Sequence, residues 1–305
     1  MGGHDHHGQR HQHGHQAPGR AAAAFRWSIA LNSGLTALQL VVGMAFGSVA
    51  LIGDALHNLG DVVGLALGWG ADQLSHKPAN GRFTYGYGRS TQMASLVNGM
   101  LIFAAGSGVV AMAVERLFNP VPLITAPVAW AAAVGVAINF FSARLFGDDH
   151  HHDLNQRAAV LHLITDAAVS VAVLINALLV GLTGWLWLDA LTAMGVGAAV
   201  IWSATGLLRE AIALNLDAAP RGIDLGAVEA MLQQLPGVQS VEELHVWGLS
   251  TSRNALTAHL RLESSQREAD PSARDALLTM ARERLAELGI RKCTLQLESA
   301  AEQHH

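Results

Sequence analysis

The sequence contains little cysteine and little charge for a chain of 305 residues. Cys293 is the single cysteine, so an intrachain disulfide is excluded and a reducing compartment is indicated. Charged residues make up only 14% of the chain. Residues 209–305 carry 10 basic and 14 acidic side chains, which gives no basic patch, so nucleic acid is not an expected partner.

The scarce charge is unevenly distributed along the chain. Residues 27–208 hold 15 charged side chains, whereas the shorter segment 209–305 holds 24. The first composition is typical of a membrane domain and the second of a soluble domain. The polar start of the chain contains six histidines and lacks the pattern of a secretory signal. We expect residues 1–24 to form a disordered tail that is kept in the mature protein.

Long uncharged stretches separate the ionisable residues of the first region. A bilayer-spanning helix needs about 20 apolar residues, and the stretches predict six such helices within residues 25–212. Basic residues concentrate in the loops of one side, with only Arg116 on the other. We therefore expect both termini to be cytoplasmic, with a soluble domain over residues 213–300 and a tail over 301–305.

Ionisable side chains interrupt two of the predicted spans. His57 and Asp61 lie four residues apart in the second span, and His162 and Asp166 repeat this spacing in the fifth. Residues four apart share one helical face, and in a membrane such a face must point into the protein. Two imidazoles and two carboxylates form a ligand set suited to tetrahedral Zn²⁺. Because all four groups bind metal best when deprotonated, the set suits a metal/proton exchanger.

These side chains also have other interpretations. A single intramembrane histidine is often only a helix-packing hydrogen bond, but two identical stripes argue against that. For Asp54, three roles remain possible from the sequence. It could line the exit path, hydrogen-bond to a metal ligand and orient it, or cap the second span. The cluster of His150, His151 and His152 is expected to gather metal at the cytoplasmic mouth, although such a tract can also be merely solvated.

The soluble region predicts helix, strand, strand, helix and strand, in that order. Residues 224–235 and 272–288 have helical periodicity, and residues 240–249, 255–263 and 292–298 alternate like strands. This pattern indicates a small α+β domain.

Several motifs resemble the cation diffusion facilitator family, in its zinc-exporter branch. "GSVALIGDALHNLGDVVGLAL" is similar to the signature of the second span and "HLITDAAVS" to that of the fifth, and "RFTYGYGR" is similar to the loop after the second span. "SVEELHVWGLS" and "LTAHLRL" resemble the family's cytoplasmic domain, which has a ferredoxin-like, metallochaperone-like fold.

The resemblance implies a homodimer that exports divalent metal from the cytoplasm against an inward proton flow, and we expect a bacterial inner membrane as its location. The resemblance also implies that His57, Asp61, His162 and Asp166 bind the transported metal, for which the ligand chemistry favours Zn²⁺, with Co²⁺, Cd²⁺ and Ni²⁺ as further substrates. It also suggests a charge interlock between Arg89 and Asp217 at the dimer interface.

Two departures from the family pattern limit these implications. The positions of a second loop metal site are occupied by Asn80, Phe83 and Tyr87, so we expect no metal there. In the cytoplasmic domain, only His259 and Glu298 match ligand positions, with Glu242 and His245 nearby in sequence. We expect any metal site there to be altered or weak.

Two other functions use the same residues. A membrane metal sensor would bind metal at the intramembrane site without net transport. An intramembrane metallohydrolase would need an open coordination position, which four protein ligands do not leave. We therefore expect a transporter and no enzyme.

Overall fold

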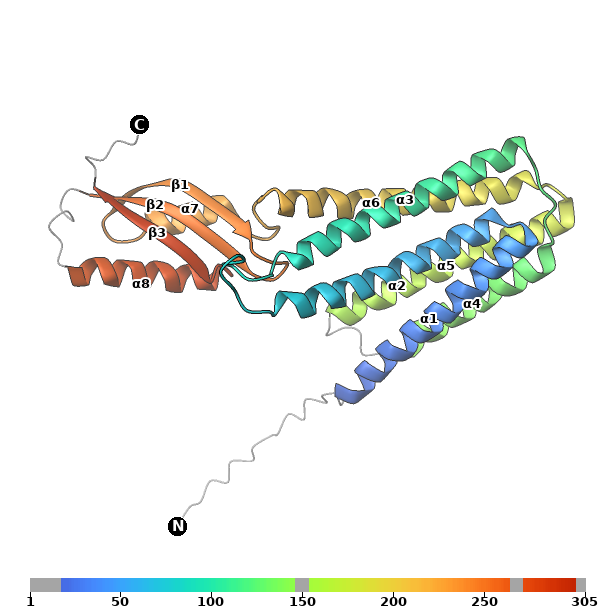
Figure 1. Ribbon diagram of the computed structural model, residues 1–305, viewed down its shortest axis with the longest axis horizontal. Coiled ribbons are helices and arrows are strands. Elements are labelled where there is room, and N and C mark those ends of the chain that lie inside the picture. Colours follow the sequence, from blue (N-terminus) through green and yellow to red (C-terminus); the bar gives the residue numbers. More distant parts are fainter. Residues whose placement is uncertain (1–17, 146–153, 264–270, 300–305) are drawn as a thin grey trace, which may run out of the picture. The chain divides into compact units, whose positions relative to one another are not determined.

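The computed structural model describes residues 18–145, 154–263 and 271–299. Six long helices come first: α1 Pro18–Phe46, α2 Val49–Ser75, α3 Ser90–Phe118, α4 Thr125–Leu145, α5 Leu154–Thr183 and α6 Trp187–Asn215 (Figure 1). Each contains a stretch long and apolar enough to cross a bilayer. A smaller α+β segment follows. The fold class expected from the sequence is confirmed.

The elements form two compact units. One consists of residues 1–62 and 108–197, and the other of residues 63–107 and 198–305. Helices α1, α4 and α5 belong to the first unit, whereas α2, α3 and α6 each contribute residues to both.

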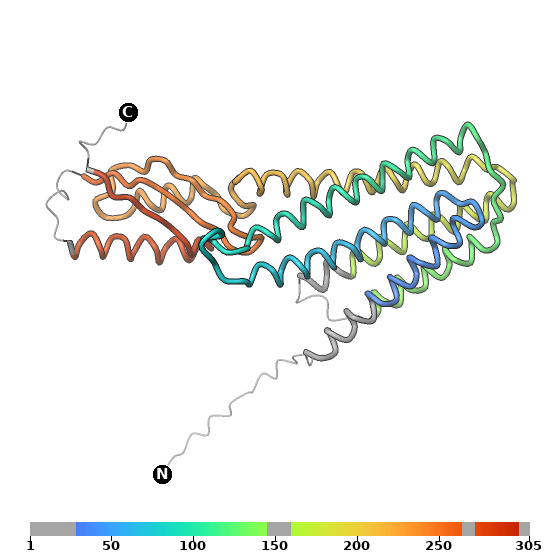
Figure 2. The backbone as a smooth tube through the Cα atoms, in the orientation of Figure 1, coloured from blue at the N-terminus to red at the C-terminus, as the bar shows by residue number. Residues whose placement is uncertain are grey.

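Small side chains fill the core of the first unit. Helix α4 packs against α1 and α5, which can be followed in Figure 2. Alanines make up much of the buried cluster: Ala113, Ala131, Ala132, Ala177 and Ala193. Such side chains let helix backbones approach closely in a membrane. Residues of α2 and α5 belong to the same cluster, so it holds the two helices that carry the histidine–aspartate stripes.

The second unit contains the α+β segment. Its elements are α7 Leu225–Gln233, β1 Val238–Gly248, β2 Asn254–Leu262, α8 Pro271–Glu287 and β3 Lys292–Ser299. The strands form one sheet in the order β1-β2-β3 (Figure 1). Strand β2 pairs antiparallel with β1 and parallel with β3, and α8 connects β2 to β3. The order of elements predicted from periodicity is thus present.

One face of the sheet carries the core of this segment. Along β2, Leu256, Ala258, Leu260 and Leu262 are buried at every second position. Leu232 of α7 and residues of α8 belong to the same cluster, so both helices cover this face. The intervening residues of β2 project from the opposite face.

The first and last of the six long helices begin at Pro18 and end at Asn215, respectively. Proline is favourable at the first helical position, and the alanines that follow Pro18 are strong helix formers.

Candidate metal site

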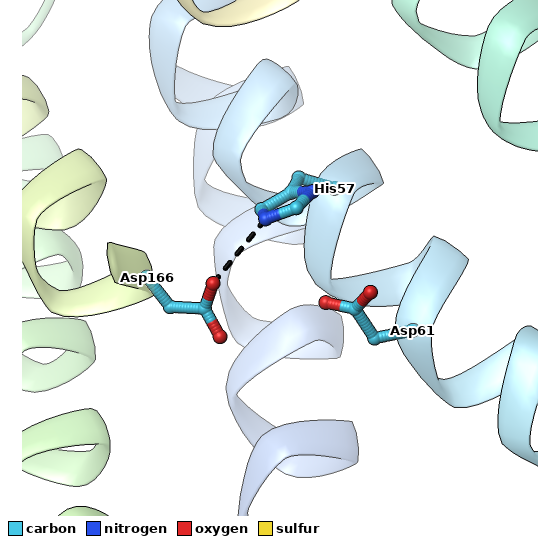
Figure 3. Close-up of side chains that lie close together, drawn as sticks. All are labelled: His57, Asp61 and Asp166. Carbon is cyan, nitrogen blue, oxygen red and sulfur yellow. Dashed lines mark hydrogen bonds and ion pairs between the residues drawn. The ribbon is translucent and has the colours of Figure 1, made fainter. Parts of the chain in front are cut away.

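The two histidine–aspartate stripes face each other inside the first unit. His57 and Asp61 project from α2 toward Asp166 of α5 (Figure 3). One potential ligand atom from each of these three residues lies within 4.8 Å of the other two. His57 Nε2 is 3.3 Å from Asp166 Oδ1. Among the described residues, this is where three potential metal ligands converge.

His162 contacts both carboxylates of this group. Its Nε2 atom lies 3.3 Å from Asp61 Oδ2 and 3.6 Å from Asp166 Oδ2. Its ring stands nearly perpendicular to that of His57, with centroids 6.2 Å apart. The structure therefore gathers all four predicted residues, with three in the tight group and His162 at its edge. We call these four residues the intramembrane site.

Two carboxylate oxygens of the intramembrane site lack a hydrogen-bond donor. Asp61 Oδ2 and Asp166 Oδ2 are buried, and neither accepts a hydrogen bond from a described residue. Both lie near His162 Nε2, but these contacts do not have hydrogen-bond geometry. An unpaired buried carboxylate oxygen is costly in a protein unless it binds a cation or a proton.

Burial changes along α2 through the site. Asp54 is fully buried, whereas the side chain of His57 is 20% exposed and that of Asp61 is 24% exposed. His162 is the most exposed member, at 48%. The site is thus closed on the Asp54 side and open toward the C-terminal end of α2.

Asp54 belongs to a buried hydrogen-bond network between helices. Its Oδ2 accepts hydrogen bonds from Gln39 Nε2 of α1 at 2.6 Å and from Ser170 Oγ of α5 at 2.9 Å. Asn58 donates to Gln39 Oε1 at 3.2 Å. The network ties α1, α2 and α5 together one helical turn from His57, and Asp54 is not the residue that caps α2.

Asp189, at the start of α6, bonds the beginning of α2. Its Oδ2 accepts from the Val49 backbone N–H at 2.7 Å, and its Oδ1 accepts from Ser48 Oγ at 2.7 Å and from Asn176 Nδ2 at 3.0 Å. In the sequence, Asp189 stands between two apolar stretches, which is the one signal that could have drawn attention to it. Its partner 140 residues away could not be identified from the sequence.

The four residues of the cytoplasmic domain that the family resemblance pointed to do not converge as those of the intramembrane site do. His259 Nδ1 lies 2.6 Å from Glu298 Oε1, and Gln296 Nε2 donates to the same oxygen at 3.1 Å. Glu242 pairs in register with His259 across the sheet, but its carboxylate accepts a hydrogen bond from Arg261 at 2.9 Å. His245 lies opposite Thr257 in the register and is exposed. The structure brings His259 and Glu298 together and leaves Glu242 and His245 with other neighbours.

Three further predictions concern the loops. Arg89 donates to Asp217 Oδ1 at 2.5 Å within one chain. Asn80 Nδ2 donates to Tyr87 Oη at 3.0 Å, and the rings of Phe83 and Tyr87 pack with centroids 4.7 Å apart. The histidines at positions 150–152 lie outside the described residues.

Six apolar helices and a cytoplasmic-type α+β domain define a multi-pass membrane protein, and the four residues of the intramembrane site form a group typical of divalent-cation sites. Residues 26–214 match the cation efflux transmembrane domain, and residues 220–300 match the cytoplasmic domain of cation efflux proteins. The chain therefore belongs to the cation diffusion facilitator family of divalent-cation efflux transporters. It is a transporter and not an enzyme, and its C-terminal domain is cytoplasmic.

Curated relatives support the same family. The chain is 31% identical to the metal cation efflux system protein CzcD of Cupriavidus metallidurans over 248 residues, which cover 81% of this chain and 78% of CzcD. It is 30% identical to the zinc transporter ZitB of Escherichia coli, covering 96% of this chain and 92% of ZitB. It is 28% identical to the cadmium, cobalt and zinc/H(+)-K(+) antiporter of Bacillus subtilis, covering 91% and 89% of the two chains.

Proposed function

We propose that this protein exports Zn²⁺ from the cytoplasm in exchange for protons, and that His57, Asp61, His162 and Asp166 form its transport site. The observation that carries the proposal is the convergence of ligand atoms from α2 and α5 within 4.8 Å, with His162 in contact with both carboxylates. ZitB is named as a zinc transporter and the Bacillus relative as an antiporter for cadmium, cobalt and zinc. Co²⁺, Cd²⁺ and Ni²⁺ are further substrates under this proposal.

The ligand set favours zinc over harder metals. Two imidazoles and two carboxylates without a thiolate suit tetrahedral Zn²⁺, whereas Mn²⁺ prefers oxygen ligands. The unpaired oxygens of Asp61 and Asp166 supply lone pairs and negative charge for the cation. Four protein ligands also leave no vacant coordination position for a hydrolytic water.

Proton exchange follows from the contacts between the ligands themselves. His57 Nε2 and His162 Nε2 each face an aspartate oxygen at 3.3 Å. A proton on either partner of such a contact occupies a lone pair that a metal ion would need. Metal binding therefore requires proton release, and proton entry favours metal release.

The exposure of the site supports loading from the cytoplasm. The chain ends in a cytoplasmic domain after six spans, so the C-terminal ends of the even-numbered helices face the cytoplasm. The site is more exposed toward the C-terminal end of α2 and closed at Asp54. On this topology the N-terminus is also cytoplasmic. Export then needs a rearrangement that opens the Asp54 side.

The remaining features complete the proposal. We propose a membrane domain over residues 25–212 and a cytoplasmic domain over 213–300 of a homodimer in a bacterial inner membrane, with tails at 1–24 and 301–305. His150, His151 and His152 gather metal at the cytoplasmic mouth. Any weak metal site of the cytoplasmic domain uses His259 and Glu298, with Glu242 and His245 only nearby, and Arg89 with Asp217 contributes to the dimer interface.

Zinc flux into proteoliposomes with an imposed pH gradient tests the transport proposal. We expect Zn²⁺ entry to follow the gradient and to be lost in Asp61→Asn and in His162→Ala. Asp72→Asn is the matched control, because Asp72 lies on the same helix but is exposed and outside the site. Saturable Zn²⁺ binding without flux under any gradient would overturn the exporter and favour a metal sensor.

A further inference from the structure

Two adjacent pockets lie in the second unit, between the loop that connects α2 to α3 and the turn that connects β1 to β2. The first, which we call the polar pocket, has a volume of about 530 Å³ and is lined mainly by Asp72, residues 75–79, the β1–β2 turn and Lys292. The second, the apolar pocket, has a volume of about 440 Å³ and is lined by residues 82–90, Met93, Trp247 and Leu249. Thr84, Tyr85 and Gly86 line both pockets, so they form a shared wall.

The polar pocket collects basic side chains from three separate segments. Lys77 comes from the loop after α2, Arg253 from the β1–β2 turn and Lys292 from the start of β3. In the part of the chain that the structure describes, none of the three forms an ion pair with a carboxylate. Asp72 is the acidic residue of the lining, and it lies 3.9 Å from the ring of His76. Among the described residues, the pocket therefore gathers three basic side chains against one acidic side chain, in a chain whose formal net charge is −5.

Hydroxyl groups complete the lining of the polar pocket. Ser75, Thr84, Thr91, Ser250, Thr251 and Ser252 lie around it. Hydroxyls and cationic side chains together are the usual partners of phosphate oxygens. The pocket thus has the chemistry of a phosphate site.

The apolar pocket is built largely from rings. Phe83, Tyr87, Trp247, Met93 and Leu249 line it, together with Tyr85 of the shared wall. The ammonium group of Lys292 lies 4.4 Å from the centre of the Tyr85 ring, so the shared wall has a cation on its polar side. A ligand that fills both pockets must be charged at one end and apolar at the other.

The walls of the pockets are fixed by contacts between the loop and the β1–β2 turn. Gln92 Nε2 of α3 donates to the Gly248 carbonyl at 3.0 Å, and the Thr251 backbone N–H donates to Thr91 Oγ1 at 3.2 Å. A Cβ atom on Gly88 would lie 2.5 Å from the Leu249 carbonyl oxygen, so the loop backbone approaches the turn too closely for a side chain. Gly86 has a φ of 75°, which favours glycine.

The pockets lie beside the loop that connects α2 to α3, which joins two candidate membrane spans. The candidate span of α2 ends at Ser75 and that of α3 begins at Ser90, so residues 76–89 connect two spans on the cytoplasmic side. Anionic headgroups of the inner leaflet attract basic side chains at this level. Aromatic rings are also enriched at this depth.

From these observations we propose that the two pockets bind one anionic phospholipid, with its phosphate in the polar pocket and the upper part of an acyl chain in the apolar pocket. The apolar pocket favours a lipid over a free phosphate anion as the ligand, because inorganic phosphate would occupy the polar pocket alone. This site is separate from the intramembrane site and does not depend on the proposed transport function.

Native mass spectrometry of the detergent-solubilised full chain tests the proposal. Phosphatidylglycerol and phosphatidylcholine with the same acyl chains are titrated separately, and the lipid-bound fraction is counted. We expect a one-to-one complex with phosphatidylglycerol and much weaker binding of phosphatidylcholine. The double variant Arg253→Gln/Lys292→Gln should bind phosphatidylglycerol roughly 25-fold more weakly, at roughly fivefold per basic residue.

Arg291→Gln is the matched control, because Arg291 is exposed and adjacent to Lys292 but lies outside the pocket lining. It should leave lipid binding unchanged, and a loss equal to that of the double variant would overturn the proposal in favour of unspecific surface charge. Inorganic phosphate and glycerol 3-phosphate are added as competitors. The proposal is supported if these competitors displace the lipid only at concentrations far above that of the lipid. If a competitor binds as tightly as the lipid, the pockets are instead a site for a soluble phosphate. Equal binding of both lipids would also overturn it.

Discussion

Two groups in this chain each combine histidine with carboxylate side chains, but they differ in the hydrogen bonds that the carboxylate oxygens accept. In the intramembrane site, buried oxygens of Asp61 and Asp166 accept no hydrogen bond from the described residues. In the cytoplasmic domain, the buried Glu298 carboxylate lies 2.6 Å from His259 Nδ1 and accepts a hydrogen bond from Gln296, and Arg261 pairs with Glu242. Under the proposed function, this difference favours the intramembrane site for metal binding. Its ligand atoms converge, and its buried carboxylate oxygens have no hydrogen-bond donor among the described residues.

The largest expected effect comes from a matched pair of histidines. His162→Ala should lower the Zn²⁺ flux more than about 100-fold, because loss of even a partner of a metal ligand costs 10- to 100-fold. His259→Ala removes the same side chain from the cytoplasmic group and should leave most of the flux. Initial rates in proteoliposomes measure both variants. An equal loss of Zn²⁺ flux in the two variants would contradict the assignment of transport to the intramembrane site alone.

A smaller effect is expected at the start of α2. Asp189→Ala removes the acceptor of the Val49 backbone N–H and of Ser48 Oγ. Loss of a helix-capping side chain costs about 0.5–2 kcal/mol, so the melting temperature in detergent should fall. Asp72→Ala is the control, since Asp72 is exposed and near the other end of the same helix. An unchanged melting temperature for Asp189→Ala would show that these bonds do not stabilise α2.

The ion pair between Arg89 and Asp217 should contribute still less. Both side chains are 51% exposed, and exposed pairs contribute about 0–1 kcal/mol. Arg89→Ala should therefore shift the melting temperature only slightly, and it should weaken the proposed dimer, which light scattering measures. A dimer as stable as that of the native protein would contradict the proposed role of the pair at the subunit interface.

No effect on transport is expected from the single thiol. Cys293 lies in β3, in the second unit, and burial raises the pKa of its thiol above the usual value, with Arg282 acting in the opposite direction. Less thiolate is then present at neutral pH, so maleimide labelling should be slow at pH 7 and faster as the pH rises. Cys293→Ser should keep full Zn²⁺ flux. A loss of flux in this variant would indicate a thiolate ligand that the proposed site lacks.

The sequence predicted the fold and the four residues of the intramembrane site because both depend on local spacing. Uncharged stretches of sufficient length identify spans, and a spacing of four residues places His57 with Asp61 on one face. Local spacing does not tell which helices are neighbours. The bonds of Asp54 to Gln39 and Ser170, and those of Asp189 to the start of α2, join residues far apart in sequence. Such partners depend on tertiary packing.

Zn²⁺ entry and internal pH recorded in the same proteoliposomes, for two matched carboxylate variants, test the central claim most directly. Asp166→Asn and Glu298→Gln each neutralise a buried carboxylate that lies beside a histidine. We predict that Asp166→Asn abolishes both Zn²⁺ entry and the opposite proton movement, whereas Glu298→Gln keeps the two coupled. Zn²⁺ entry at the native rate in Asp166→Asn, with its proton movement intact, would contradict the account.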